Sequence, residues 1–222
     1  MLEVNKKQVL NITNGDCFNE YFLKKFGGHA LPFCEAMMDG EAHEVVYSNE
    51  FVEKRCNALG VSEEEYRSKM HVYNAINNDK DKFSELCLWF GKDTFCQMNL
   101  LTLLAYLEEI DYKGNVTLNY IDDESFEVIE ENITVRLGVY KKIYSEILLS
   151  HRQPTEIGVL WGKAIDLYFD YHSKDGALSQ IVRKNINDDE HSLLCRLLLS
   201  SAEYGLSDTQ AKGIIDRIKN CK

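Results

Sequence analysis

The most constraining feature of this sequence is a buried strand, a tight turn and a long apolar helix in direct succession. Residues 85–90 (ELCLWF) are nearly all apolar, which is typical of a strand covered on both faces of a sheet. A three-residue turn, Gly91-Lys92-Asp93, leads into residues 94–110, which are Leu-rich over most of a helical surface, and a strand at residues 116–121 follows. This order predicts a parallel crossover unit and therefore an α/β fold.

The segments before this unit fit the same pattern. Residues 8–13 (QVLNIT) predict a strand that ends at the turn Asn14-Gly15-Asp16, and aromatic residues at helical spacing fill residues 18–26. Residues 30–33 predict a second strand. We therefore expect a Rossmann-like, three-layer domain over residues 1–150, with an open, mostly parallel sheet and helices on both faces.

The later part of the chain shows helical patterns only. From about Gly138 onward, helices are expected at residues 139–149 and 155–171, and further helices follow to residue 220. Pro154 is one of two prolines in the chain and marks the expected boundary. Residues 151–222 are thus predicted to form an all-helical C-terminal region.

Two shorter patterns predict where helices begin and which faces they bury. Ser62 with Glu65, and Ser207 with Gln210, have the spacing of capping boxes. Tyr66, Met70, Tyr73 and Ile76 recur at the spacing of one helical face, which predicts a single helix after Ser62.

Composition excludes some partners. The chain carries 25 Lys and Arg against 36 Asp and Glu, a formal net charge of −11, and has no basic run. Nucleic acids and anionic membranes are therefore poor partners for this acidic protein. The seven cysteines form no C-x-x-C pair, so we interpret them as reduced core thiols. Met1–Lys7 lacks the apolar core of a signal peptide, and a cytoplasmic location is expected.

Acidic residues follow three of the predicted strands. Asp16 and Asp93 come directly after residues 8–13 and 85–90, and Glu35 and Asp39 lie in the loop after residues 30–33. Ligands of open parallel sheets bind at the carboxyl ends of the strands. One hypothesis is a Mg²⁺ or Mn²⁺ site that bridges to phosphate, and another is a carboxylate acting as a general base or a ribose ligand.

A local role explains two of these residues equally well. Asp16 and Asp93 are each placed to cap a helix N-terminus, which stabilises a protein by about 1 kcal/mol without any chemistry. Capping and ligand binding are compatible, and the free N–H groups of helices after Gly15 and Gly91 are also potential anion sites. Neither Gly-rich nucleotide fingerprint, G-x-G-x-x-G after the first strand or the P-loop, is present.

Other residues receive a plainer interpretation. Cys17 follows Gly-Asp as some hydrolase nucleophiles do, but the late histidines lack the required Asp three residues before them, so packing at a helix start is favoured. Arg136 is a candidate to fix a carboxylate or phosphate, with an ion pair to Glu130 or Glu131 as the alternative. We expect Trp89 and Trp161 in the core, and the acidic run 122–124 in a solvated loop.

Several motifs resemble a bacterial family catalogued as domain of unknown function family 1835. The matching stretches are Asn14–Cys17 (family N-G-D-S), Leu31–Gly40 (Pro, aromatic, acid, three residues, acid, Gly), and Leu88–Asp93 with Gln97–Leu101 (family L-W-F-x-H-D-x-x-x-Q-L-x-L-L). Tyr204–Ser207 is similar to a helical companion region that follows that domain. The resemblance implies no established activity, but it adds Lys92 and Gln97 to the candidate ligand-binding residues.

The chain departs from that family at four places. Cys17 replaces Ser, Lys92 replaces His, Cys96 stands where Asp is frequent, and Phe33-Cys34 replaces Trp-Arg. No role of the family's Ser, His or Arg is therefore carried over to these positions.

Two functions of different classes remain. The first is an enzyme or binding protein for a phosphate-bearing small molecule, with catalytic candidates Asp16, Glu35, Asp39 and Asp93, further ligand-binding candidates Gly15, Cys17, Lys92, Gln97 and Arg136, and Mg²⁺ as a potential cofactor. The second is a non-catalytic interaction or regulatory module whose C-terminal helices bind a protein partner or form a homodimer.

Overall fold

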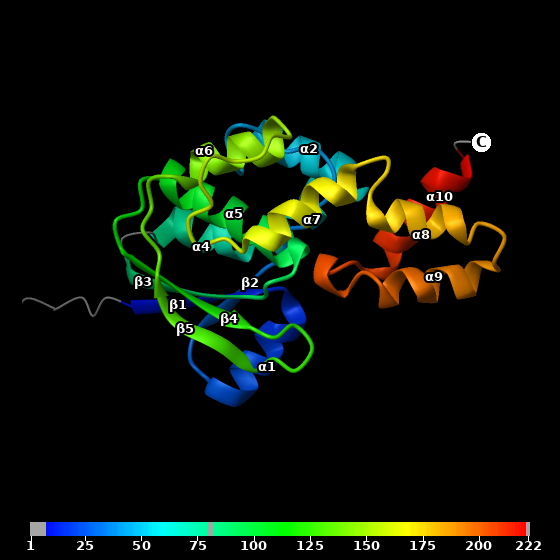
Figure 1. Cartoon of the computed structure of the whole chain (residues 1–222). Helices are drawn as coiled ribbons and strands as arrows, with labels where there is room; N and C mark the ends of the chain where they lie inside the picture. Colours follow the sequence, from blue (N-terminus) through cyan, green and yellow to red (C-terminus); the bar gives the residue numbers. More distant parts are fainter. Residues whose placement is uncertain (1–7, 80–81, 221–222) are drawn as a thin grey trace, which may run out of the picture.

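A computed structural model describes residues 8–79 and 82–220 as a five-stranded sheet with flanking helices (Figure 1). The strands are β1 (Gln8–Asn14), β2 (Ala30–Phe33), β3 (Phe83–Phe90), β4 (Asn115–Ile121) and β5 (Val128–Thr134). Their order is β2-β1-β3-β4-β5. The first four are parallel and β5 is antiparallel to β4, so the predicted α/β class with a mostly parallel sheet is confirmed. The expectation for Met1–Lys7 lies outside the described residues.

Strand β5 was not expected from the sequence. It forms a hairpin with β4 through residues 122–127 and occupies one edge of the sheet. Its side chains are nearly all exposed, so the segment VIEENIT lacks the alternation that identifies a half-buried strand. This hairpin brings the acidic run 122–124 back to the end of the sheet.

Helices lie on both faces of the sheet. Helix α1 (Asp16–Phe26) packs Phe18 and Phe22 against Ala30, Ile121 and the half-buried Trp89 on one face. The opposite face carries the main core, which includes Leu86, Leu88 and Phe90 of β3 and residues of α4 (His71–Asp79), α5 (Thr94–Glu109) and α6 (Tyr140–Tyr144). Figure 1 shows α1 below the sheet, the labelled helices from α2 to α7 above it, and the last three helices of the chain to its right.

Helix α5 is the centre of this core. Every side chain from Thr94 to Leu107 except that of Phe95 is buried, including polar Gln97 and Asn99. The predicted apolar helix is therefore confirmed, with its start at Thr94 and its end at Glu109, one residue before the predicted end. Because α5 begins directly after β3, its buried position also fixes the residues at its N-terminus against the sheet.

The segment after Ser62 contains two helices instead of the single one predicted. Helix α2 (Asn49–Leu59) is followed by α3 (Glu63–Lys69), which begins with the expected Ser62–Glu65 capping box. Met70 then adopts φ −86° and ψ 53°, which interrupts the helix before α4. Tyr66, Met70, Tyr73 and Ile76 are nevertheless all buried, so the predicted apolar face was correct although the continuous helix was wrong.

All elements described after β5 are helical. A π-helical turn at Ser145–Leu149 extends α6, and α7 (Gly162–His172), α8 (Ala177–Lys184), α9 (Glu190–Leu199), a short 3-10 helix (Ala202–Tyr204) and α10 (Asp208–Asn220) follow. Helix α7 begins later than predicted. Helices α8–α10 enclose a second hydrophobic cluster that includes Val182, Leu193 and Ile214. Among residues 8–79 and 82–220, no helix has the length and apolar character needed to cross a membrane.

Candidate functional site

The strand order places a topological switch point between β1 and β3. The chain leaves β1 toward β2 on one side, whereas β3 continues to β4 on the other, so the connections diverge at the carboxyl ends of these two strands. Side chains join the end of β1 to helix α5, which follows β3. Asn14 Nδ2 lies 2.8 Å from Cys96 Sγ, and Asn14 Oδ1 accepts a hydrogen bond of 3.1 Å from Asn99 Nδ2.

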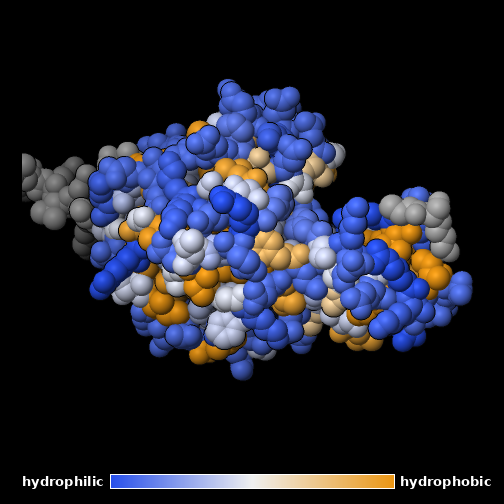
Figure 2. All heavy atoms as spheres, turned by 45° about the horizontal axis from the view of Figure 1, so that its top comes forward, coloured by the Kyte–Doolittle hydropathy of each residue, from blue (hydrophilic) through white to orange (hydrophobic). Residues whose placement is uncertain are grey.

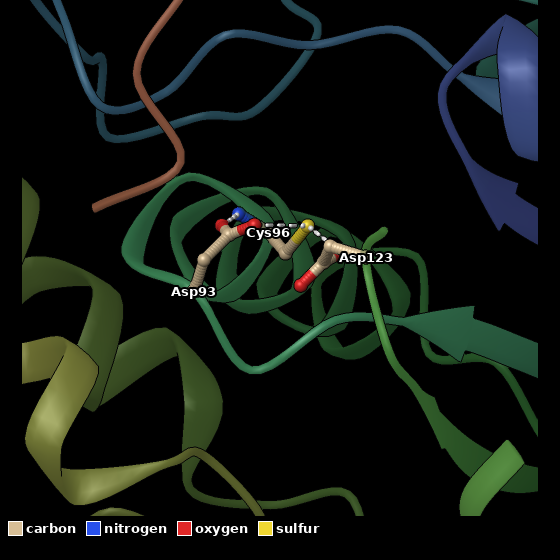
Figure 3. A group of neighbouring side chains, drawn as sticks. All are labelled: Asp93, Cys96 and Asp123. Atoms are coloured by element: carbon tan, nitrogen blue, oxygen red, sulfur yellow. Dashed lines mark hydrogen bonds between the residues drawn. The ribbon is translucent and has the colours of Figure 1, made fainter. Parts of the chain in front are cut away.

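Two carboxylates and one thiol meet at this edge (Figure 3). Asp93 comes from the β3–α5 connection, Cys96 from the first turn of α5, and Asp123 from the β4–β5 hairpin. Cys96 Sγ lies 3.3 Å from Asp93 Oδ2 and 3.3 Å from Asp123 Oδ1. One oxygen of each carboxylate and the sulfur all lie within 4.8 Å of one another, so these three residues could hold a metal ion.

Backbone structure fixes the position of Asp93. Its Oδ1 accepts a hydrogen bond of 2.6 Å from the backbone N–H of Cys96, so Asp93 is the N-cap of α5, as predicted. A Cβ on Gly205, which has φ +68°, would lie 2.6 Å from the Asp93 carboxyl group. A Cβ on Gly91 would overlap the carboxyl group of Asp123. The absence of a side chain at Gly205 and Gly91 therefore leaves room for the carboxyl groups of Asp93 and Asp123.

The close approach of the carboxylates changes their protonation. Burial, together with the nearby Asp93 charge, raises the pKa of Asp123 to about 7, and burial also raises the pKa of Asp93 against its helix-capping hydrogen bonds. Burial and both carboxylates raise the pKa of the Cys96 thiol well above its usual value. Cys96 is thus a protonated hydrogen-bond donor, and the close approach of the two carboxyl groups favours the protonated form of Asp123.

A cavity of about 240 Å³ opens beside this group. Its walls come from the β3–α5 connection, the β4–β5 hairpin, the first half of α7 and the 3-10 helix at Ala202–Tyr204. Besides Asp93 and Asp123, its lining includes Lys92, Lys163 and Trp161 and three further acidic residues, Asp122, Glu124 and Glu203. Trp161 is 43% exposed, so its expected place in the core was wrong; Pro154 and the irregular segment after it leave the ring outside the main core.

The cavity residues contact one another in a defined way. Lys92 Nζ lies 4.4 Å from the ring centre of Trp161 and 4.8 Å from that of Tyr120, and 3.7 Å from Glu130 Oε2. Gln97 is fully buried behind this wall, where Nε2 donates to Gly91 O and Oε1 accepts from the Trp161 backbone N–H at 2.8 Å. Gln97 therefore joins the β3–α5 connection to the segment that carries Trp161.

The candidates at the end of β1 lie apart from this cavity lining. Gly15, with φ 80°, occupies the N-cap of α1, and Asp16 is the first helical residue, so the expected Asp16 cap was wrong by one position. The Asp16 carboxylate instead lies 3.6 Å from Cys34 Sγ and 4.0 Å from Lys69 Nζ. Cys17 is exposed.

Glu35 and Asp39 have separate sets of partners. Glu35 is buried, accepts a hydrogen bond from Tyr66, and lies 3.4 Å from the Nε atom of the fully buried Arg55. Asp39 accepts hydrogen bonds from Tyr171 (2.7 Å) and Gln210 (2.5 Å) on α7 and α10. Both residues hold the 35–40 loop in place and do not line the cavity. Arg136 is exposed before α6 and also lies outside the cavity lining.

Two members of the central group were missed by sequence reasoning. Cys96 was noted only as a departure from a family pattern, and Asp123 was interpreted as solvated loop charge. Asp123 could have been found if β5 had been predicted. In an antiparallel β4–β5 hairpin, the connecting turn that contains Asp123 must lie at the carboxyl end of β4.

Known proteins provide no independent assignment. Comparison of the chain with protein-family models, with curated proteins and with solved structures finds no match.

Proposed function

We propose that the protein binds a phosphate-bearing small molecule in the cavity at the carboxyl ends of β3 and β4, with a divalent cation held by Asp93 and Asp123. The observation that carries this proposal is the combination of a close carboxylate pair with Lys92, Lys163 and the exposed ring of Trp161 around one cavity. The position of the cavity agrees with a Rossmann-like fold, because open α/β sheets bind ligands at the carboxyl ends of their strands, near the switch point.

The two lysines supply the positive charge that a phosphate requires. Lys163 pairs with Glu203 and Lys92 lies near Glu130, so each ammonium group is already held at the cavity wall by a carboxylate. An entering phosphate would compete for these ammonium groups through charge-assisted hydrogen bonds. Trp161 provides a flat apolar surface for the organic part of the ligand.

The carboxylate pair fits a hard divalent cation. No Lys or Arg among the described residues lies within ion-pair distance of Asp93 or Asp123. Mg²⁺ is commonly bound by one or two carboxylates together with substrate phosphates. Cys96, as a neutral thiol, would not be a ligand of Mg²⁺, whereas a softer ion such as Zn²⁺ would recruit it as a thiolate.

Without a cation, the same pair supports acid–base chemistry. A carboxylic acid with a pKa of about 7 is poised to donate or accept a proton under neutral conditions. Asp123, at the cavity wall, would be the group that exchanges the proton, and Asp93, which caps α5, would remain fixed. Asp16, Glu35 and Asp39 have no part in this proposed chemistry.

The alternative function as an interaction module has less support. Among the described residues of helices α7–α10, Leu199 is the one large apolar side chain that is strongly exposed, at 85%. A single exposed leucine does not form a docking patch. On the face seen in Figure 2, hydrophilic residues predominate and the hydrophobic ones are scattered in small groups.

A binding experiment tests the proposal. Isothermal titration of the purified chain with Mg²⁺, Mn²⁺ and Zn²⁺, each with and without nucleotides or sugar phosphates, should give one site for a hard cation that strengthens phosphate binding. Asp123→Asn should abolish cation binding. Lys163→Gln should lower the affinity for the phosphate compound and leave the affinity for the cation unchanged. Glu127→Gln, an exposed residue of the same hairpin outside the cavity lining, is the matched control.

The metal preference gives a second readout. If Mg²⁺ or Mn²⁺ binds, Cys96→Ser should leave the affinity unchanged, whereas a Zn²⁺ site would be lost. Absence of binding by every cation and phosphate compound, or equal binding by Asp123→Asn, would overturn the proposal.

A further inference from the structure

A second cavity lies in the C-terminal helices, away from the Asp93–Asp123 pair. Its volume is about 500 Å³, and it is formed by the end of α7, the α7–α8 connection, α8 and the end of α10. None of its lining residues lines the first cavity. The two spaces are therefore separate.

The charged side chains that line this cavity are of one sign. Lys174, Arg183 and Arg217 line it, and its lining contains no Asp or Glu. In a chain with 36 acidic and 25 basic residues, such a cationic wall is a local reversal of the overall charge. Arg183 is held by Asp175 at 3.1 Å, and both side chains remain largely solvent-accessible.

The remaining lining residues are apolar or neutral. Tyr171, Ile186 and Ile218 belong to or pack against the second hydrophobic cluster and form an apolar floor. His172 Nε2 lies 3.0 Å from Met38 O, which can only accept, so this nitrogen carries the proton. Burial lowers the pKa of His172, which favours a neutral ring with Nδ1 as an acceptor.

We propose that this second cavity binds an organic anion: a carboxylate, phosphate or sulfonate attached to an apolar or aromatic body. The acidic group would contact Arg183 and Arg217, whose guanidinium groups recognise such anions through paired hydrogen bonds. The apolar body would lie on Tyr171, Ile186 and Ile218. This proposal is independent of the function proposed for the first cavity.

A local explanation exists for two of the cations. Arg183 and Arg217 lie in the last turns of α8 and α10, where positive charge interacts favourably with the helix dipole. That role would affect stability and would not create a ligand preference. It also leaves unexplained why Lys174, in the α7–α8 connection, faces the same cavity.

The test uses two fluorescent probes that differ in one group. 8-Anilinonaphthalene-1-sulfonate carries an acidic group on an aromatic body, and N-phenyl-1-naphthylamine is its neutral analogue. The full chain should bind the sulfonate at one site, more tightly than the neutral analogue, and inorganic phosphate should compete. In Arg183→Gln/Arg217→Gln, the sulfonate affinity should fall on the order of ten-fold, because charge-assisted hydrogen bonds are lost. Binding of the neutral analogue should not change.

Two controls make the outcome decisive. Lys212→Gln removes an exposed cation from α10 outside the cavity lining and should leave the sulfonate affinity unchanged. Thermal unfolding of each variant separates a helix-dipole role from a binding role. The proposal is overturned if both probes bind alike, or if the double variant binds the sulfonate as the unaltered chain does. An affinity that falls instead in Lys163→Gln would place the anion in the first cavity and would equally overturn it.

Discussion

The chain holds carboxylates in two contrasting environments, one after β2 and one after β3. Glu35 is buried with Arg55, so the negative charge has a cation within the protein, and Tyr66 donates a further hydrogen bond. Asp93 and Asp123 face each other across a thiol at a cavity, with no lysine or arginine of the described residues in ion-pair contact. The first arrangement has its counter-ion within the protein. The second becomes electrostatically complete only when a proton or a cation binds.

The contrast shows how to separate structural from functional acidic residues. Arg55 also donates to the carbonyl groups of Ala36 and Asp39, both at 2.7 Å, so the Glu35 pair fixes the shape of a loop. Altering this pair should chiefly change folding. Altering the Asp93–Asp123 pair should chiefly change protonation and binding, and the following predictions test that division.

The largest effect is expected at Arg55. Arg55→Met leaves the Glu35 charge buried without its cation, which should destabilise the fold by about 3–5 kcal/mol, measured by urea unfolding. The double variant Glu35→Gln/Arg55→Met should recover a substantial part of this loss, because no buried charge remains. A double variant as unstable as Arg55→Met would show that the ion pair is not the source of the effect.

A smaller effect is expected at Asp93. Asp93→Ala removes the N-cap of α5 and should cost about 1 kcal/mol, whereas Asp93→Asn keeps the cap and should be close to neutral in stability. Both variants should lose cation binding. Unfolding curves and titrations of the same two samples separate the capping role from the ligand role.

The pH dependence of stability should distinguish Asp123 from Asp122, the preceding residue. Because the pKa of Asp123 rises from its ordinary 3.8 to about 7, the folded protein retains a proton that the unfolded chain releases between these values. The contribution of this group is therefore present at low pH and is lost as the pH rises through 7. Asp123→Asn should unfold at a higher temperature than the unaltered chain at pH 8, and the difference should vanish near pH 4.

The pKa of the Asp122 carboxyl group is shifted in the opposite direction to that of Asp123. Hydrogen bonds from Ser125 lower the pKa of Asp122, so its contribution is present above its ordinary pKa and is lost as the pH falls. Asp122→Asn should therefore be slightly less stable than the unaltered chain at pH 8. Equal behaviour of Asp122→Asn and Asp123→Asn would contradict the raised pKa of Asp123.

The smallest change in stability is expected at Gly91. In Gly91→Ala the new methyl group would occupy the space of the Asp123 carboxyl group, which is the far end of a side chain and can turn away. The free energy of unfolding should change little at pH 4. Its decrease between pH 4 and pH 8 should be smaller than in the unaltered chain, because the two carboxyl groups are farther apart. Potentiometric or NMR titration of the Asp123 carboxyl group measures this directly.

Much of the fold could be predicted from local signals. The apolar run before Gly91, the Leu-rich helix after it and the Asp93 cap depend on neighbouring residues, and the structure confirms all three. The break at Met70 could not be predicted, since its apolar face continues through both helices. Edge strand β5 was missed because its side chains are solvated on both faces.

The candidate site was only half predictable for the same reason. Asp93 follows its own strand directly, so its place at the sheet edge is a local property. Asp123 reaches the same point because β5 pairs with β4 and so places their connecting turn there. Trp161 is held there by a hydrogen bond from its backbone N–H to the buried Gln97 of α5. These are long-range contacts, and their partners leave no periodic signal in the sequence.

The exposed ring of Trp161 gives this protein a built-in optical reporter. The chain contains two tryptophans, and Trp89 packs among Phe18, Phe22 and Phe26 on the opposite face of the sheet. Its emission supplies a constant background. The ammonium group of Lys92 rests 4.4 Å from the centre of the Trp161 ring, so a molecule that draws this lysine away alters the emission and its quenching by acrylamide. Occupation of the first cavity can thus be followed by intrinsic fluorescence, with no label attached.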